Sequence, residues 1–221
     1  MEASGVKLIA FDVDGTLFSS ETIILEVYEK AIREFTQETN HKIETPSRER
    51  ILLEVGKPVK VIFQNLLPEL QDEERETVSQ RVLQLLCDEV RVGGGNYYAG
   101  VGSTINYLRD QGYTLVCASN GRRPYVETVL ETAGVLDHFE PILVVGKGDI
   151  QNKSQLVSEY LRKYQISGRS LAMIGDRRSD WEAARENGCL FGYCLYGHCV
   201  IGEVPDTDWS LNSLEDLKSI F

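Results

Sequence analysis

The chain is short of basic side chains. Its 221 residues contain 23 Lys and Arg against 34 Asp and Glu, which gives a formal net charge of -11 at pH 7. A protein that binds the phosphate backbone of a nucleic acid needs clustered positive charge. The sequence therefore disfavours a nucleic-acid partner, and an anionic ligand would need positive charge supplied locally by its own site.

Long apolar runs are absent as well. No stretch approaches the roughly 20 apolar residues that span a bilayer, and residues 1–15 lack the basic start and apolar region of a signal peptide. We therefore expect no membrane partner and a cytoplasmic protein. The sequence offers no basis for assigning an oligomeric state.

Cysteine and histidine are scarce. The five cysteines form no even set of pairs, and a chain of this length builds a core without disulfides, so we expect reduced thiols. Three of them lie with His198 in CLFGYCLYGHC (residues 189–199), whose aromatic, strand-like character favours buried thiols over a zinc site. The other two histidines, His41 and His138, are expected at the surface or in packing, and no Ser-His-Asp arrangement follows from the spacing.

The spacing of apolar residues differs between two regions of the sequence. From residue 19 to 94, apolar residues recur at helical spacing with turn signals between them, which predicts a helical insertion. From residue 95 onward, helical patterns alternate with short apolar runs, which favours a parallel sheet. With the first apolar run included, five strands are expected, at 7–11, 113–119, 141–145, 170–176 and 190–196. We predict a doubly wound α/β core made of residues 1–18 and 95–221.

Two acids follow the first strand directly. In DVDGT, Asp12 and Asp14 stand one residue apart, and two like charges about 4 Å apart repel by roughly 4 kcal/mol at a typical effective dielectric. An Asp-Gly turn with an exposed Asp14 is one explanation. The other is a site where a cation or a proton offsets the repulsion.

Polar residues follow other strands at the same edge of the predicted sheet. The carboxyl ends of parallel strands meet there, which would bring Ser119, Asn120 and the GDRRSD segment (175–180) to DVDGT. The start of the helix at Lys153 would join them. Carboxylate oxygens with a fixed positive charge suit a magnesium ion held beside a phosphoryl group.

These four motifs resemble those of the haloacid dehalogenase superfamily. The later segments, from YYAGVG to ASNG and SDWEAARENG, are similar to its phosphoglycolate phosphatase and phosphoglucomutase branch. The resemblance implies a Rossmann-like core under a helical cap, here residues 19–94, and a magnesium-dependent hydrolase of a small phosphorylated metabolite, phosphoglycolate-like or a sugar phosphate. A phosphomutase and a non-catalytic binding protein with the same fold are the alternatives.

The resemblance also implies roles for single residues. Asp12 would be the nucleophile that forms an aspartyl-phosphate, and Asp14 the general acid and base. Ser119 and Lys153 would hold the phosphoryl oxygens. The expected metal ligands are Asp12, Asp14, Asp176 and Asp180, and the expected substrate contacts are Thr16, Asn120, Gly121 and Lys57.

The sequence leaves alternatives open for the roles of several lysines. Lys147 is a rival to Lys153, and we prefer Lys153 because it begins the helix KSQLVSEYL. Truncating Lys153 is expected to spare folding, because its partner charges would lie in a solvent-accessible cleft. In the insertion, a Gly-Lys-Pro turn would aim Lys57 or Lys60 at the substrate, unless both are ordinary surface lysines.

Overall fold

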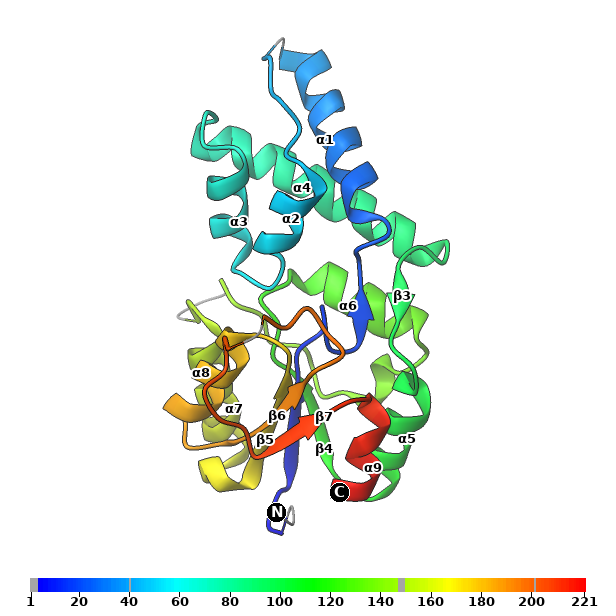
Figure 1. The fold of residues 1–221 in the computed structure, drawn as a ribbon, viewed down its shortest axis with the longest axis vertical. Coiled ribbons are helices and arrows are strands. Elements are labelled where there is room, and N and C mark those ends of the chain that lie inside the picture. The colour runs from blue at the N-terminus through cyan, green and yellow to red at the C-terminus, as the bar shows by residue number, and fades with distance from the viewer. Residues whose placement is uncertain (1–3, 40, 147–149, 201) are drawn as a thin grey trace.

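A five-stranded parallel sheet forms the centre of the larger part of the molecule. The computed structural model describes residues 4–39, 41–146, 150–200 and 202–221. The strand order is β4-β1-β5-β6-β7, and every neighbouring pair is parallel (Figure 1). The strands are β1 (Leu8–Phe11), β4 (Thr114–Cys117), β5 (Leu171–Gly175), β6 (Leu190–Cys194) and β7 (Trp209–Leu211). The predicted α/β fold is confirmed.

Helices cover both faces of this sheet, as a parallel sheet requires. Successive side chains of β1 alternate between the faces: Ile9 and Phe11 join one hydrophobic cluster, and Leu8 and Ala10 join the other. The first cluster packs against α5 (Val101–Asp110), α6 (Arg123–Thr132) and α9 (Leu217–Ile220), and the second against α7 (Lys153–Tyr164) and α8 (Arg178–Glu186). Figure 1 shows α7 and α8 on the opposite side of the sheet from α5 and α9.

Four helices form a second part, which lies beyond the carboxyl edge of the sheet (Figure 1). They are α1 (Ile24–Thr39), α2 (Arg48–Glu54), α3 (Val59–Leu66) and α4 (Asp72–Arg91). These helices have a hydrophobic cluster of their own, which supports the proposed cap at 19–94 with the core at 1–18 and 95–221. None of the helices that the structure describes is long and apolar enough to cross a membrane.

A short antiparallel ribbon joins the two parts. It pairs β2 (Phe18–Ser19) with β3 (Asn96–Tyr97), one strand from each side of the helical insertion. The Phe18 and Tyr97 rings pack edge to face, with centroids 5.0 Å apart. The chain therefore leaves and re-enters the core at one place, where residues 18–19 and 96–97 hold the two connections together.

The strand predicted at 141–145 is wrong. Phe139 makes only an isolated bridge with Leu115, and residues 141–145 form no strand. Pro141 has no N–H group to continue a ladder. The Tyr160 hydroxyl, from α7, donates to the Cys117 carbonyl at 2.7 Å and accepts from the Leu143 N–H at 3.4 Å. A side-chain hydroxyl thus stands between the two backbones in place of direct pairing.

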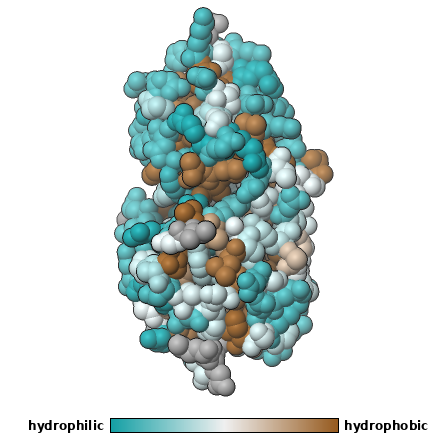
Figure 2. Space-filling model, in the orientation of Figure 1, coloured by the Kyte–Doolittle hydropathy of each residue, from teal (hydrophilic) through white to brown (hydrophobic). Residues whose placement is uncertain are grey.

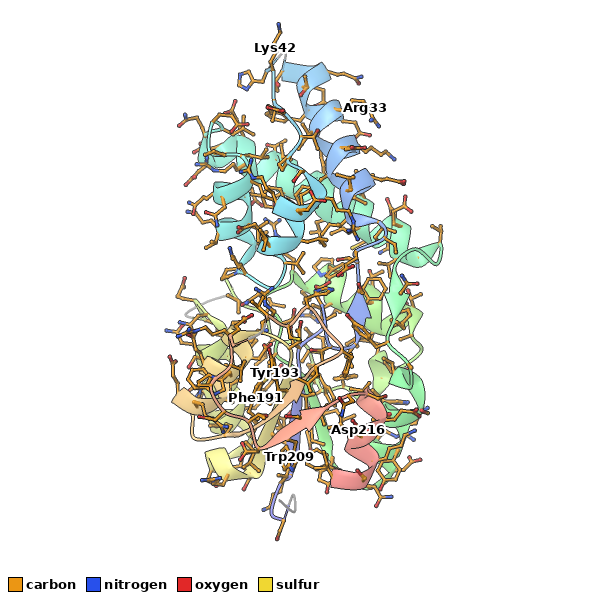
Figure 3. The ribbon with its side chains drawn as sticks, in the orientation of Figure 1. Arg33, Lys42, Phe191, Tyr193, Trp209 and Asp216 are labelled. Atoms are coloured by element: carbon orange, nitrogen blue, oxygen red, sulfur yellow. The ribbon has the colours of Figure 1, made fainter. Side chains whose placement is uncertain are left out.

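The fifth strand is instead β7, which the sequence analysis missed. Trp209 and Leu211 are buried, and Ser210 between them is exposed. The Trp209 ring lies beside Gly192 of β6, whose neighbours Phe191 and Tyr193 are labelled with it in Figure 3. A strand of three residues is too short to show a recognisable alternation of apolar and polar residues in the sequence.

Substitution of Tyr160 by Phe tests the hydroxyl between the two backbones. The change leaves the buried Cys117 carbonyl without its donor, so we expect a loss of about 1–3 kcal/mol in the free energy of unfolding. Urea denaturation measures it. Tyr164→Phe on the same helix is the matched control, because its hydroxyl bonds Glu140 in a partly exposed setting. Equal effects of the two substitutions would contradict the role assigned to Tyr160.

Candidate active site

The predicted site residues meet at the carboxyl edge of the sheet. Lys153 Nζ lies 3.0 Å from Asp12 Oδ1 and 2.5 Å from Asp180 Oδ1. All three side chains are buried, with Lys153 only 3% exposed. They come from the end of β1, the first turn of α7 and the first turn of α8. The structure therefore brings the end of β1 to two segments that follow it in the sequence by more than a hundred residues.

Local hydrogen bonds position Lys153 and Asp180. Asn152 caps α7 by accepting from the Gln155 N–H at 2.9 Å, which begins the helix at Lys153. Asp180 Oδ2 accepts from the backbone N–H groups of Asp176 and Arg177, at 3.1 and 2.9 Å. This carboxylate therefore holds the loop after β5 with one oxygen and the lysine with the other.

Asp176 lies beside this group and completes a carboxylate cluster. Ligand oxygens of Asp12, Asp176 and Asp180 lie within 4.8 Å of one another. Thr16 is fully buried, and its hydroxyl donates to Asp176 Oδ1 at 3.4 Å. It lies beside the cluster and is absent from the cavity wall, so a direct substrate contact of Thr16 stays a prediction.

The cluster carries more negative charge than its protein partners balance. Burial raises the pKa of Asp12 and of Asp176, and the neighbouring Asp180 raises that of Asp176 further. Burial also raises the pKa of Asp180 to about 6, although Lys153 lowers it. Burial opposes the charge of Lys153, but Asp12 and Asp180 outweigh that effect and raise its pKa. One lysine thus faces three carboxylates.

This arrangement fits a hard divalent cation. Asp12 Oδ2 is buried and has no hydrogen-bond partner among the described residues, and the cluster presents only carboxylate oxygens, as Mg²⁺ prefers. Asp12, Asp176 and Asp180 could hold the ion. A cation there would also remove the cost of three buried charges.

Asp14 has a separate setting on the cavity side of Asp12. Its Oδ1 accepts from the Tyr125 hydroxyl at 2.7 Å and from the Ser20 hydroxyl at 3.4 Å. Burial raises the pKa of Asp14 to about 6, against the lowering effect of these two hydrogen bonds. The sequence analysis missed Tyr125 and Ser20, because nothing distinguishes a tyrosine in an amphipathic helix from an ordinary core residue.

A backbone donor at His198 was missed as well. Its N–H donates to Asp176 Oδ2 at 2.7 Å, while Nε2 of its ring lies 3.3 Å from Glu21 Oε1. The preceding Gly197 makes this possible, since a Cβ there would come within 2.0 Å of the Gly15 carbonyl oxygen. The sequence analysis expected a surface or packing residue, whereas the His198 ring contacts Glu21 and Ser19 and its backbone N–H contacts Asp176.

The loop after β4 faces the helical part. Ser119 Oγ accepts from the Gly121 N–H at 3.0 Å, which turns this loop toward the site. Asn120 Nδ2 donates to the Gly56 carbonyl at 2.7 Å, and its Oδ1 is buried without a partner among the described residues. Asn120 therefore contacts the helical part directly, while its oxygen stays available to a ligand.

A cavity of about 90 Å³ lies between the two parts. Its walls come from helices α1 to α4, residues 55–57, α6 and the loops after β1 and β4, with Asp12, Asp14, Ser119, Asn120 and Gly121 at the core side. Figure 2 shows hydrophobic surface on the helical part where it faces the sheet part.

The candidate lysines differ in position. Lys57 borders the cavity, but its ammonium pairs with Glu54 at 2.8 Å and its side chain is 40% exposed. Lys60 pairs with Asp72 and is 73% exposed, outside the wall of this cavity, so its predicted substrate contact is not supported. Lys147 lies outside the described residues.

Comparison with known proteins identifies the family. Residues 9–193 match the family model of haloacid dehalogenase-like hydrolases. The chain belongs to this family. It is 26% identical to a phosphoglycolate phosphatase of Escherichia coli K12, over 95% of this chain and 91% of that protein. It is 27% identical to a phosphoglycolate phosphatase of Vibrio vulnificus, over 86% and 83%. The predicted branch, and with it the phosphatase class, is confirmed.

Solved structures agree on the fold. A predicted phosphoglycolate phosphatase from Haemophilus somnus superposes with a TM-score of 0.83 at 20% identity, over 98% of both chains. CbbY from Rhodobacter sphaeroides, solved in complex with phosphate, superposes with a TM-score of 0.75 at 19% identity, over 96% of both chains. At these identities the likeness concerns the fold alone.

In this member of the haloacid dehalogenase-like family, Arg177 links the carboxylate cluster to the helical part. Its Nη1 donates to the Val55 carbonyl at 2.8 Å, at the C-terminal end of α2, and its Nε donates to Glu203 at 3.2 Å. Its backbone N–H is held by Asp180. Arg177 and Asn120 therefore fasten the successive carbonyls of Val55 and Gly56 to the core.

Replacing Lys153 by Met tests its burial between the carboxylates. The earlier expectation that folding would be spared is revised, because the lysine is buried and not in an open cleft. Removing one partner of a buried ion pair costs about 3–5 kcal/mol, which urea unfolding without added metal would measure. Lys163→Met on the same helix is the control, since Lys163 is 40% exposed. A loss below about 1 kcal/mol would show that the carboxyls take up protons instead.

Replacing Arg177 by Ala tests the link to residues 55–56. Loss of a hydrogen bond from a charged donor costs about 1.5–3 kcal/mol, so we expect KM for a phosphate ester to rise about tenfold as the loop loosens. The neighbouring Arg178→Ala is the control, because Arg178 pairs with Glu182 on the surface. An unchanged KM in the Arg177 variant would rule out a part for this contact in substrate binding.

Proposed function

We propose that the protein is a magnesium-dependent phosphomonoester hydrolase that acts on a small phosphorylated metabolite through an aspartyl-phosphate on Asp12. The observation that carries the proposal is the position of Asp12, between a buried ammonium and two further carboxylates, at the edge of a cavity. Lys153 holds one of its oxygens and leaves the other without a protein partner. A nucleophile and a phosphoryl group would meet there.

The first half of the reaction transfers the phosphoryl group to the protein. The Asp12 carboxylate attacks phosphorus, the bond from phosphorus to the ester oxygen breaks, and Asp14 gives its proton to the departing oxygen. Ser119 and Lys153 hold the phosphoryl oxygens, and Asn120 Oδ1 is free to accept from the substrate. A bound Mg²⁺ would supply positive charge against the phosphoryl oxygens, with Asp12, Asp176, Asp180 and the Asp14 backbone as its candidate ligands.

The second half returns the protein to its starting state. Asp14 now takes a proton from a water molecule, whose oxygen attacks phosphorus and displaces the Asp12 carboxylate. Inorganic phosphate leaves. Tyr125 and Ser20 hold Asp14 in place for both steps through their hydrogen bonds to Oδ1. Because the curated relatives are named phosphoglycolate phosphatases, phosphoglycolate and sugar phosphates are the first natural substrates to test.

Two substitutions separate the roles of the paired acids. Asp12→Asn should abolish both turnover and phosphoenzyme formation, because an amide is no nucleophile. Asp14→Asn should slow turnover by about 100- to 10,000-fold, the usual contribution of general acid-base catalysis, while a phosphoenzyme still accumulates. Rapid quenching with a labelled ester measures both quantities. Equal phosphoenzyme in wild type and Asp12→Asn would overturn the assignment.

Release of inorganic phosphate from a chromogenic ester, with Mg²⁺ and then with EDTA, tests the function as a whole. Release that requires Mg²⁺ and no second substrate supports a hydrolase over a mutase. A purified, folded protein that releases no phosphate from any ester would favour a binding protein.

A further inference from the structure

The walls of the cavity beyond Asp12 and Asp14 are mainly apolar. Aliphatic and aromatic side chains from α1, α3 and α4 form them, among them Ile24, Tyr28, Val59, Ile62, Phe63 and Leu83. The Tyr28 and Phe63 rings stack with centroids 5.7 Å apart and an interplanar angle of 7°. An apolar group bound there would be removed from water and would make hydrophobic contacts with the wall.

Several polar side chains on the same wall are engaged within the protein, although Asn120 Oδ1 has no partner among the described residues. The hydroxyls of Ser20 and Tyr125 donate to Asp14. Ser79 Oγ accepts from Arg122 at 2.9 Å, and the Asn120 amide donates to Gly56. A sugar that carries several hydroxyls would have to compete for these partners, and each unpaired hydroxyl would carry a desolvation cost.

The two cations at the cavity are engaged as well. Lys57 pairs with Glu54 at 2.8 Å, and Arg122 pairs with Glu76 at 2.7 Å. Both acids belong to the helical part, so each of the two cations at the cavity already has an acidic partner. A second anionic group on the substrate, such as a carboxylate, would have to compete with these acids for the two cations.

We propose that the substrate's organic group is apolar and uncharged, an alkyl or aryl group carried on the phosphate monoester. The inference rests on the proposed phosphatase activity and narrows its substrate class. It departs from the phosphoglycolate-like or sugar-phosphate substrate expected from the sequence. The phosphate would lie at Asp12 and Lys153, and the organic group would contact the wall formed by α1, α3 and α4.

A homologous series of substrates tests the inference. Methyl, ethyl, n-propyl and n-butyl phosphates have closely similar leaving groups, so differences in kcat/KM report binding of the chain. Each buried methylene should raise kcat/KM by up to about fourfold. We expect at least a tenfold rise from methyl to n-butyl phosphate, and n-butyl phosphate should exceed 2-phosphoglycolate and glucose 6-phosphate.

Matched variants locate the contact. Ile62→Asn places a polar group on the wall and should lower kcat/KM for n-butyl phosphate by about tenfold, with that for methyl phosphate changed less than about twofold. Val61→Asn is the control, because Val61 is exposed and lies outside the wall. Val59→Thr, which keeps the shape of the side chain, is a milder second variant in case Ile62→Asn fails to fold.

The outcomes separate this inference from the function on which it rests. If no ester of any kind releases phosphate with Mg²⁺, the proposed function fails. If 2-phosphoglycolate or glucose 6-phosphate is hydrolysed best, or if the alkyl series is flat, the hydrolase stands and the apolar substrate class is overturned.

Discussion

The buried ammonium of Lys153 is the contact on which the site depends. It joins the end of β1 to the starts of α7 and α8, because Asp12 and Asp180 both contact it. A buried ion pair contributes little net stability, since desolvation of the charges offsets their attraction. Such a triad is therefore better explained by geometry than by stability: it holds Asp12 in one orientation. Asp180 extends that control to the loop carrying Asp176 through the two N–H groups it accepts.

Two directional hydrogen bonds fasten residues 55–56 of the helical part to the core, in addition to the packing of α4 against α6. Asn120 and Arg177 each bond one backbone carbonyl of residues 55–56. The neutral bond contributes about 1 kcal/mol and the charged one about 1.5–3 kcal/mol. Contacts of this size break readily, yet they position the cavity wall above Asp12 when formed. Because Arg177 also follows Asp176 directly in the chain, this one residue connects the loop of the carboxylate cluster to Val55 of the cavity wall.

The sequence predicted the parts of this molecule that follow from local pattern and strand direction. Asp12, Ser119 and Asp176 could be placed together because the carboxyl ends of parallel strands share an edge. The features that the sequence analysis predicted wrongly or missed depend on contacts between distant segments. The Tyr160 hydroxyl replaces strand pairing near 141–145, and the N–H of His198 reaches Asp176. A backbone donor has no signature in residue types, so no motif could have revealed it.

The cavity combines two demands that conflict in an ordinary apolar pocket. In the proposed reaction, hydrolysis of the aspartyl-phosphate would require one ordered water, whereas an apolar wall excludes water from the rest of the space. The structure separates the two regions. Tyr125 and Ser20 make a polar corner at Asp14, where both hydroxyls donate to Oδ1 and neither engages the second oxygen. The α1, α3 and α4 side chains form the remainder. An apolar leaving group would fill that remainder during the first half of the reaction, and its departure would open the space to water for the second, with Asp14 already held in place.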